Sequence, residues 1–62
     1  MTNEEKLKLR NLVTENVAKI YENSNKICET KNQIERMKFA MEISNSAFFL
    51  HRVITEILNP NN

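Results

Sequence analysis

The fold is decided by residues 13–48, VTENVAKIYENSNKICETKNQIERMKFAMEISNSAF, in which an apolar residue recurs at every seventh position. The column consists of Val13, Ile20, Ile27, Ile34, Met41 and Phe48. A repeat of seven is typical of α-helices that pack along other helices. The chain contains no glycine, and its one proline is Pro60, so neither of the two strongest helix breakers occurs earlier. The sequence therefore predicts an all-α protein.

Two antiparallel helices are expected, over about residues 3–26 and 30–58, as a helical hairpin. Thr2 and Glu5 fit a capping box, in which each side chain binds the backbone amide of the other residue, so the first helix should begin near residue 3. Residues 22–26 contain no apolar side chain, and their asparagine and serine residues favour turns. The first helix is therefore expected to end in this region.

The break is placed between residues 22 and 32, because Thr30 and Gln33 fit a second capping box. No glycine marks the end of the first helix, so one long coiled-coil helix is an alternative. Three small polar residues at 44–46 give another alternative, a three-helix domain. The proline should end the last helix and leave a frayed tail at 59–62.

A chain of 62 residues buries only about 60% of the surface that its unfolded form exposes, so it needs a further source of stability. Cys28 is the only cysteine, which excludes a disulfide within the chain, and with His51 it makes a poor metal site. No metal or other cofactor is expected. Association remains, and a homodimeric four-helix bundle is the simplest form, with a larger protein as the other candidate partner.

The composition and the motifs disfavour several classes of function. A formal net charge of +1 gives no field that would attract nucleic acid or an anionic membrane. No apolar run approaches the length of a membrane span, and the polar start is unlike a signal peptide, so a cytoplasmic protein is expected. No grouping of nucleophile, base and acid is present, and a chain without glycine has no phosphate-binding loop. We therefore expect no enzymatic activity.

The interface is expected along the apolar column and the apolar block that begins at Ala47. Phe49 is the best candidate for an intermolecular anchor, because aromatic residues often dominate binding energy. In a hairpin, Phe48 and Leu50 would face the first helix and Phe49 would point outward. The expected interface residues are Val13, Ile20, Ile27, Ile34, Met41, Phe48, Phe49, Leu50, Val53 and Ile57.

Polar residues occupy most positions three residues after the members of the column. Asn16 and Asn23 are expected to point to solvent, although a buried asparagine between helices could fix their register. Cys28 is expected to be a small buried apolar residue.

These observations predict a small protein–protein interaction module, such as an adaptor, regulator, inhibitor or assembly subunit. The alternative is a DNA-binding regulator, in which residues 33–54 form a helix-turn-helix with its turn at 44–46. Arg36, Lys38 and Arg52 would then contact phosphates, although glutamates are interleaved with the basic residues of this half.

Overall fold

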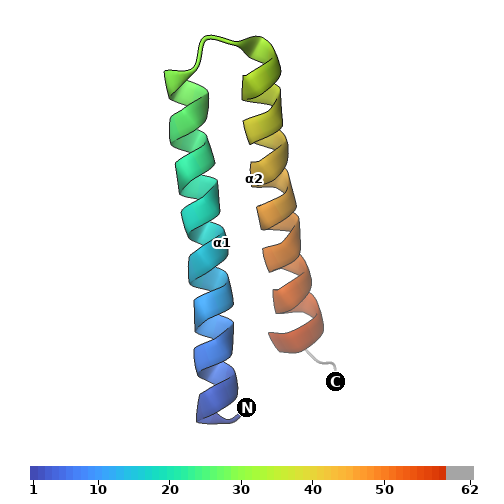
Figure 1. The fold of residues 1–62 in the computed structure, drawn as a ribbon. Coiled ribbons are helices and arrows are strands. Elements are labelled where there is room, and N and C mark those ends of the chain that lie inside the picture. The colour runs from blue at the N-terminus through green and yellow to red at the C-terminus, as the bar shows by residue number, and fades with distance from the viewer. Residues whose placement is uncertain (59–62) are drawn as a thin grey trace.

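The computed structural model describes residues 1–58, and the side chains of residues 1–56. It contains the helix α1 (Asn3–Glu29), the helix α2 (Gln33–Val53) and a short π-helical segment, η1 (Ile54–Leu58), that continues α2. Figure 1 shows α1 and α2 side by side and antiparallel, joined by one tight loop. The predicted all-α hairpin is confirmed, and the alternative of one long helix is wrong. The expected frayed tail lies outside the described residues.

The start of α1 is the predicted capping box. The backbone amide of Glu5 donates to Thr2 Oγ1 at 3.1 Å, and the backbone amide of Thr2 donates to Glu5 Oε1 at 2.8 Å. The hydrogen bond from the Thr2 backbone amide, and after it the interaction of the carboxylate with the Thr2 hydroxyl, lower the pKa of the Glu5 carboxyl below its usual value of 4.5. The negative charge also complements the positive end of the helix dipole.

The first helix continues three residues beyond the predicted end at residue 26. Two polar residues in the expected break turn their side chains back onto their own helix. Asn23 Nδ2 donates to the carbonyl of Lys19 at 2.7 Å, and Ser24 Oγ donates to the carbonyl of Ile20 at 2.8 Å. Because these side chains bond the preceding turn instead of capping it, the run does not end the helix.

The loop consists of Thr30, Lys31 and Asn32. Asn32, not Thr30, caps α2, because its side-chain oxygen accepts from the amides of Ile34 at 2.9 Å and Glu35 at 3.1 Å. Thr30 instead ends α1 in an extended conformation, with φ −88° and ψ 148°, and Asn32 is extended as well. Two extended residues reverse the chain without a positive φ, which is why no glycine is needed.

The second helix runs without a break through Ser44, Asn45 and Ser46. Ser46 is buried, with 7% of its surface exposed, so it belongs to the contact with α1 and not to a turn. The three-helix alternative is therefore wrong. The turn required by the helix-turn-helix interpretation is also absent from this helix.

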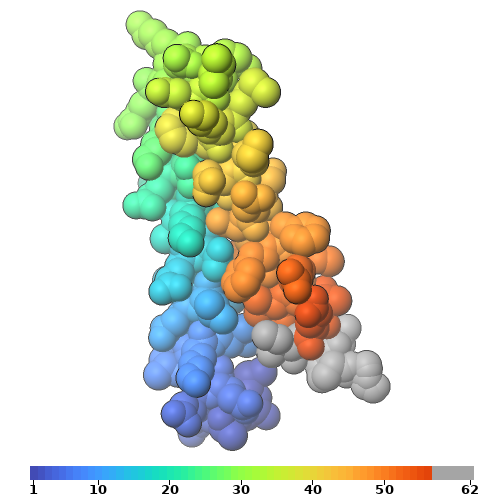
Figure 2. Space-filling view, turned by 45° about the vertical axis from the view of Figure 1, so that its right-hand side comes forward, coloured from blue at the N-terminus to red at the C-terminus, as the bar shows by residue number. Residues whose placement is uncertain are grey.

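The two helices form a single thin layer. The principal extents are 45 × 20 × 10 Å, and the radius of gyration is 14.5 Å, against about 11 Å for a compact domain of this length. Figure 2 shows the side chains of α1 and α2 meeting along the length of the hairpin. Val53 is the only apolar residue among the described side chains that is buried.

Candidate interaction surface

The contact between the helices, which we call the seam, follows alternating steps of three and four residues. All of its positions on both helices are buried or half-buried. Two of them, Arg36 and Thr30, also form hydrogen bonds in the loop region. The seam consists of Leu9, Val13, Asn16, Ile20, Asn23, Ile27 and Thr30 on α1 and its end, and of Arg36, Phe39, Ile43, Ser46, Leu50 and Val53 on α2. This spacing keeps one stripe of each helix against the other.

The predicted apolar column divides at the loop. Val13, Ile20 and Ile27 lie in the seam, as part of the half-buried stripe of α1. Ile34, Met41 and Phe48 lie on the side of α2 that faces away from α1, with exposed fractions of 68%, 63% and 65%. The reason is geometric, because a three-residue loop that is not helical changes the rotational phase between the helices, so a repeat counted through it does not stay on one face.

Polar residues occupy the middle of the seam. Asn16 is 8% exposed, and its Nδ2 donates to the carbonyl of Leu12 in the same helix at 2.8 Å. Ser46 is equally far from the centre of the loop on α2, so the two buried polar residues lie at the same level of the hairpin. The expectation that Asn16 points to solvent is wrong, and Asn23 is half-buried.

One flank of the seam is charged on both helices. Leu12 of α1 and Phe49 of α2 line the same shallow hollow, which places the flanks that carry them on one face of the hairpin. Lys26 and Glu35 share a second hollow on this face, where Lys26 Nζ lies 5.6 Å from the centre of the Phe39 ring. We call this surface the charged face.

The charged face has fifteen positions, and twelve of them are Lys, Arg or Glu. Its residues are Glu5, Lys8, Leu12, Glu15, Lys19, Glu22, Lys26 and Glu29 on α1, and Glu35, Lys38, Glu42, Asn45, Phe49, Arg52 and Glu56 on α2 and η1. Both signs alternate along it. This pattern is typical of a surface that remains in water.

The opposite flank of the seam is almost uncharged, and we call it the neutral face. Its fifteen positions are Asn3, Leu7, Arg10, Thr14, Val17, Tyr21, Ser24 and Cys28 on α1, and Gln33, Met37, Ala40, Ser44, Ala47, His51 and Ile54 on α2 and η1. Arg10 is the one Lys, Arg, Asp or Glu among them. Because the charged flanks of the two helices share one face, these flanks share the other.

Large apolar side chains on the neutral face are open to solvent. Val17 is 51% exposed, Tyr21 68%, Met37 62% and Ile54 51%. The outward stripe of Ile34, Met41 and Phe48 borders the same face along α2. An apolar surface of this extent, next to a mostly charged one, is typical of a site that another protein covers.

The apolar block around residue 49 is oriented differently from the prediction. Phe48 does not face α1 but points away from it, while Leu50 is half-buried in the seam as expected. Phe49 is 40% exposed and lies beside Leu12 on the charged face. Phe48 is thus the more accessible of the two phenylalanines, and the anchor role of Phe49 stays a prediction. The side chain of Ile57, another expected interface residue, lies outside those described.

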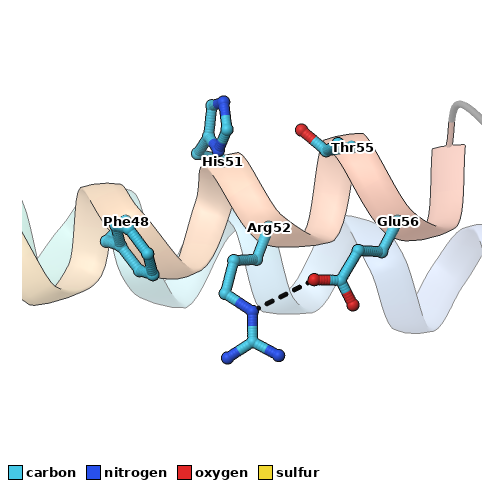
Figure 3. Close-up of a pocket in the computed structure, with 5 residues that line it drawn as sticks. All are labelled: Phe48, His51, Arg52, Thr55 and Glu56. Atoms are coloured by element: carbon cyan, nitrogen blue, oxygen red, sulfur yellow. Dashed lines mark hydrogen bonds and ion pairs between the residues drawn. The ribbon is translucent and has the colours of Figure 1, made fainter.

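The last described turns of α2 and η1 surround a further shallow hollow, shown in Figure 3. Arg52 Nε donates to Glu56 Oε2 at 3.2 Å, an exposed ion pair one turn apart. His51 and Thr55 point away from this pair (Figure 3). Side chains that diverge in this way do not converge on a ligand, and a surface ion pair of this kind contributes little stability.

Cys28 is exposed, so the expectation of a buried cysteine is wrong. It lies near the loop, and no second cysteine is available to it within the chain. Among the residues that the structure describes, no three His, Cys, Asp or Glu side chains form a group that could hold a metal ion. Neither described helix is apolar enough, over a sufficient length, to cross a membrane.

The chain matches no protein-family model, no curated protein and no solved structure. The contrast between the charged face and the neutral face is therefore the main functional observation.

Proposed function

We propose that this protein is a small non-enzymatic protein–protein interaction module that docks through its neutral face. The observation that carries the proposal is the unequal distribution of charge, with twelve charged positions of fifteen on one face and one of fifteen on the other. Burial of apolar area is the main favourable term in protein association, about 25 cal/mol per Å2. The exposed side chains of Val17, Tyr21 and Met37 supply such area without the cost of desolvating charges.

The charged face supports the proposal by limiting how a partner can bind. A partner that covered this face would have to desolvate both signs of charge, which costs free energy unless every charge finds a partner. Specific binding often depends on such unfavourable alternatives. The neutral face is therefore the preferred docking surface, in the role of an adaptor, regulator, inhibitor or assembly subunit.

The cytoplasm is the proposed location. The thiol of Cys28 is exposed, and an accessible cysteine without a partner in its own chain stays reduced in that compartment. In an oxidising compartment the same thiol would be free to form disulfides between molecules.

The DNA-binding alternative has no observation in its favour. Lys38 and Arg52 lie among glutamates on the charged face, and Arg36 donates through Nε to the carbonyl of Thr30 at 2.9 Å. Three basic residues placed in this way do not form a continuous positive surface along a phosphate backbone.

Site-specific photo-crosslinking in the native host tests the proposed function. Benzoylphenylalanine replaces Tyr21 on the neutral face in one sample and the exposed Asn45 on the charged face in the other. We expect protein adducts from position 21, identified by mass spectrometry, and few from position 45. Equal yields from the two positions, or none from position 21, would contradict the proposal.

A further inference from the structure

We propose that the occupant of the neutral face is a second copy of this chain, so that two hairpins form a four-helix bundle. This inference rests on the proposed function and deepens it by naming the partner. It follows from the exposed area of the hairpin, from the angle between its two apolar stripes and from the chemistry of the neutral face.

The exposed area of the chain is larger than a folded monomer of its size should have. The chain exposes 5182 Å2, whereas a compact monomer of 7.3 kDa is expected to expose about 4,200 Å2. The excess, about 1,000 Å2, is comparable to the roughly 800 Å2 that each partner buries in a stable interface. One further hairpin of the same size is thus sufficient to cover it.

The angle between the seam and the neutral face suits a square bundle. Successive residues turn by about 100° around an α-helix, so the neutral stripe of each helix is centred about 100° from its seam stripe. In a four-helix bundle each helix contacts two neighbours in directions roughly at right angles. Val17 and Tyr21 on α1, with Ala40 and Ala47 on α2, occupy the direction of the second neighbour.

The neutral faces of two copies can also pack against each other without bringing many like charges together. In a two-fold dimer the same surface patch lies on both sides of the interface, so a charged patch would place like charges together. The neutral face carries Arg10 as its only charge, and this residue lies toward the end of the hairpin far from the loop. Large side chains such as Tyr21 and small ones such as Ala47 are both available, which allows close packing between copies.

Sedimentation equilibrium of the full chain, from micromolar to millimolar concentration, tests the inference. We expect the mass to approach twice the monomer value of 7.3 kDa. The double variant Val17→Lys with Met37→Lys should raise the dissociation constant at least about tenfold, because two new charges would enter the interface on each copy. Circular dichroism of the same samples reports whether the helices are intact.

A charge-matched control changes the other face. Asn45→Lys with Glu22→Gln adds the same net charge as the first variant, but both positions lie on the charged face. This control should keep the dissociation constant of the unmodified chain. Equal weakening by the two double variants would overturn the inference, because the effect would then come from net charge and not from the neutral face.

A measurement without substitutions covers the case in which the lysine variant fails to fold. In a mixture of isotope-labelled and unlabelled chains, nuclear Overhauser effects between copies should reach the methyl groups of Val17 and Ala47, but not those of Leu12 on the charged face. Contacts at Leu12 alone would overturn the inference.

The mass measured by sedimentation equilibrium also distinguishes a failure of this inference from a failure of the proposed function. A helical chain that stays at 7.3 kDa at every concentration would exclude the second copy. The crosslinking experiment at position 21 would then decide whether a different protein uses the neutral face. Adducts with a different, larger protein would support the proposed function and contradict self-association.

Discussion

The seam and the neutral face use apolar residues in opposite ways. Inside the hairpin, the middle of the seam is polar, with Asn16 and Ser46 buried at the same level, and Val53 is the one buried apolar residue described. Outside it, Tyr21 and Met37 expose more than half of their surface. This difference indicates that a single hairpin leaves much of its apolar surface exposed to solvent. The stability of the hairpin therefore depends on what covers the neutral face. The predictions below test this comparison.

The largest effect is expected at Val53, which is 5% exposed. Val53→Asp places a carboxylate in the driest part of the seam and should lower the free energy of unfolding by about 3 kcal/mol. Urea unfolding followed by circular dichroism, at one protein concentration, measures the change. Asn45→Asp on the same helix is the control and should alter the value by less than about 0.5 kcal/mol. If both variants lose the same stability, the seam has no special role.

A smaller difference in the free energy of unfolding is expected between substitutions at two nearby residues of α2, measured on the purified chain. Leu50→Ala removes a half-buried seam side chain and should cost about 1.5 kcal/mol, somewhat less than a fully buried leucine. Phe48→Ala removes a side chain that is 65% exposed and should cost less than about 0.5 kcal/mol. The same unfolding experiment compares them. The reverse order would mean that the outward stripe, and not the seam, stabilises the molecule.

Replacing the buried asparagine of the seam with an apolar residue should increase the stability of the chain. Asn16→Leu replaces a buried amide with an apolar side chain and should raise the free energy of unfolding by about 1 kcal/mol. A buried asparagine that fixes register also limits alternative associations, so the variant should form a broader range of oligomers in sedimentation velocity. A loss of stability would show that the hydrogen bond to Leu12 matters more than apolar burial.

The smallest effect concerns the cap of α1. Thr2→Ala removes the hydroxyl, which caps the Glu5 amide and is the second cause of the lowered pKa, but it keeps the Thr2 backbone amide, so the pKa of the Glu5 carboxyl should rise only part of the way toward its usual value of 4.5. Because the pKa of Glu5 is lowered in the folded chain, its stabilising contribution is present above pH 4.5 and is lost as the pH falls through the lowered value. A side-chain NMR titration measures the pKa in both proteins. An unchanged pKa would show that the hydroxyl does not hold the carboxylate.

Much of the fold follows from the sequence. Helix spacing and the capping box at Thr2 predict the start of α1, and the absence of glycine and early proline predicts long helices. The end of α1 does not follow from the sequence alone, because Asn23 and Ser24 can either cap a helix or bond the turn before them.

The candidate surface was predicted only in part. A repeat of seven gives the face of one helix, but it carries no information about the phase change produced by the loop. Ile34, Met41 and Phe48 were therefore grouped with residues of the seam, although the structure exposes them. Asn32 contains the missing signal, since an asparagine two residues before Ile34 is a strong helix cap.

The uneven seam has a consequence for how the chain folds. Val53, the buried apolar residue described, lies at the end of the seam far from the loop and is separated from Leu9 by 44 positions in the sequence, whereas the apolar residues beside the loop, Ile27 and Phe39, are only half-buried. Closing the loop alone therefore gains only part of the hydrophobic free energy of the seam, and the rest requires the distant ends to come together. We therefore expect a hairpin that forms in one cooperative step, with no populated intermediate in which only the turns beside the loop are paired.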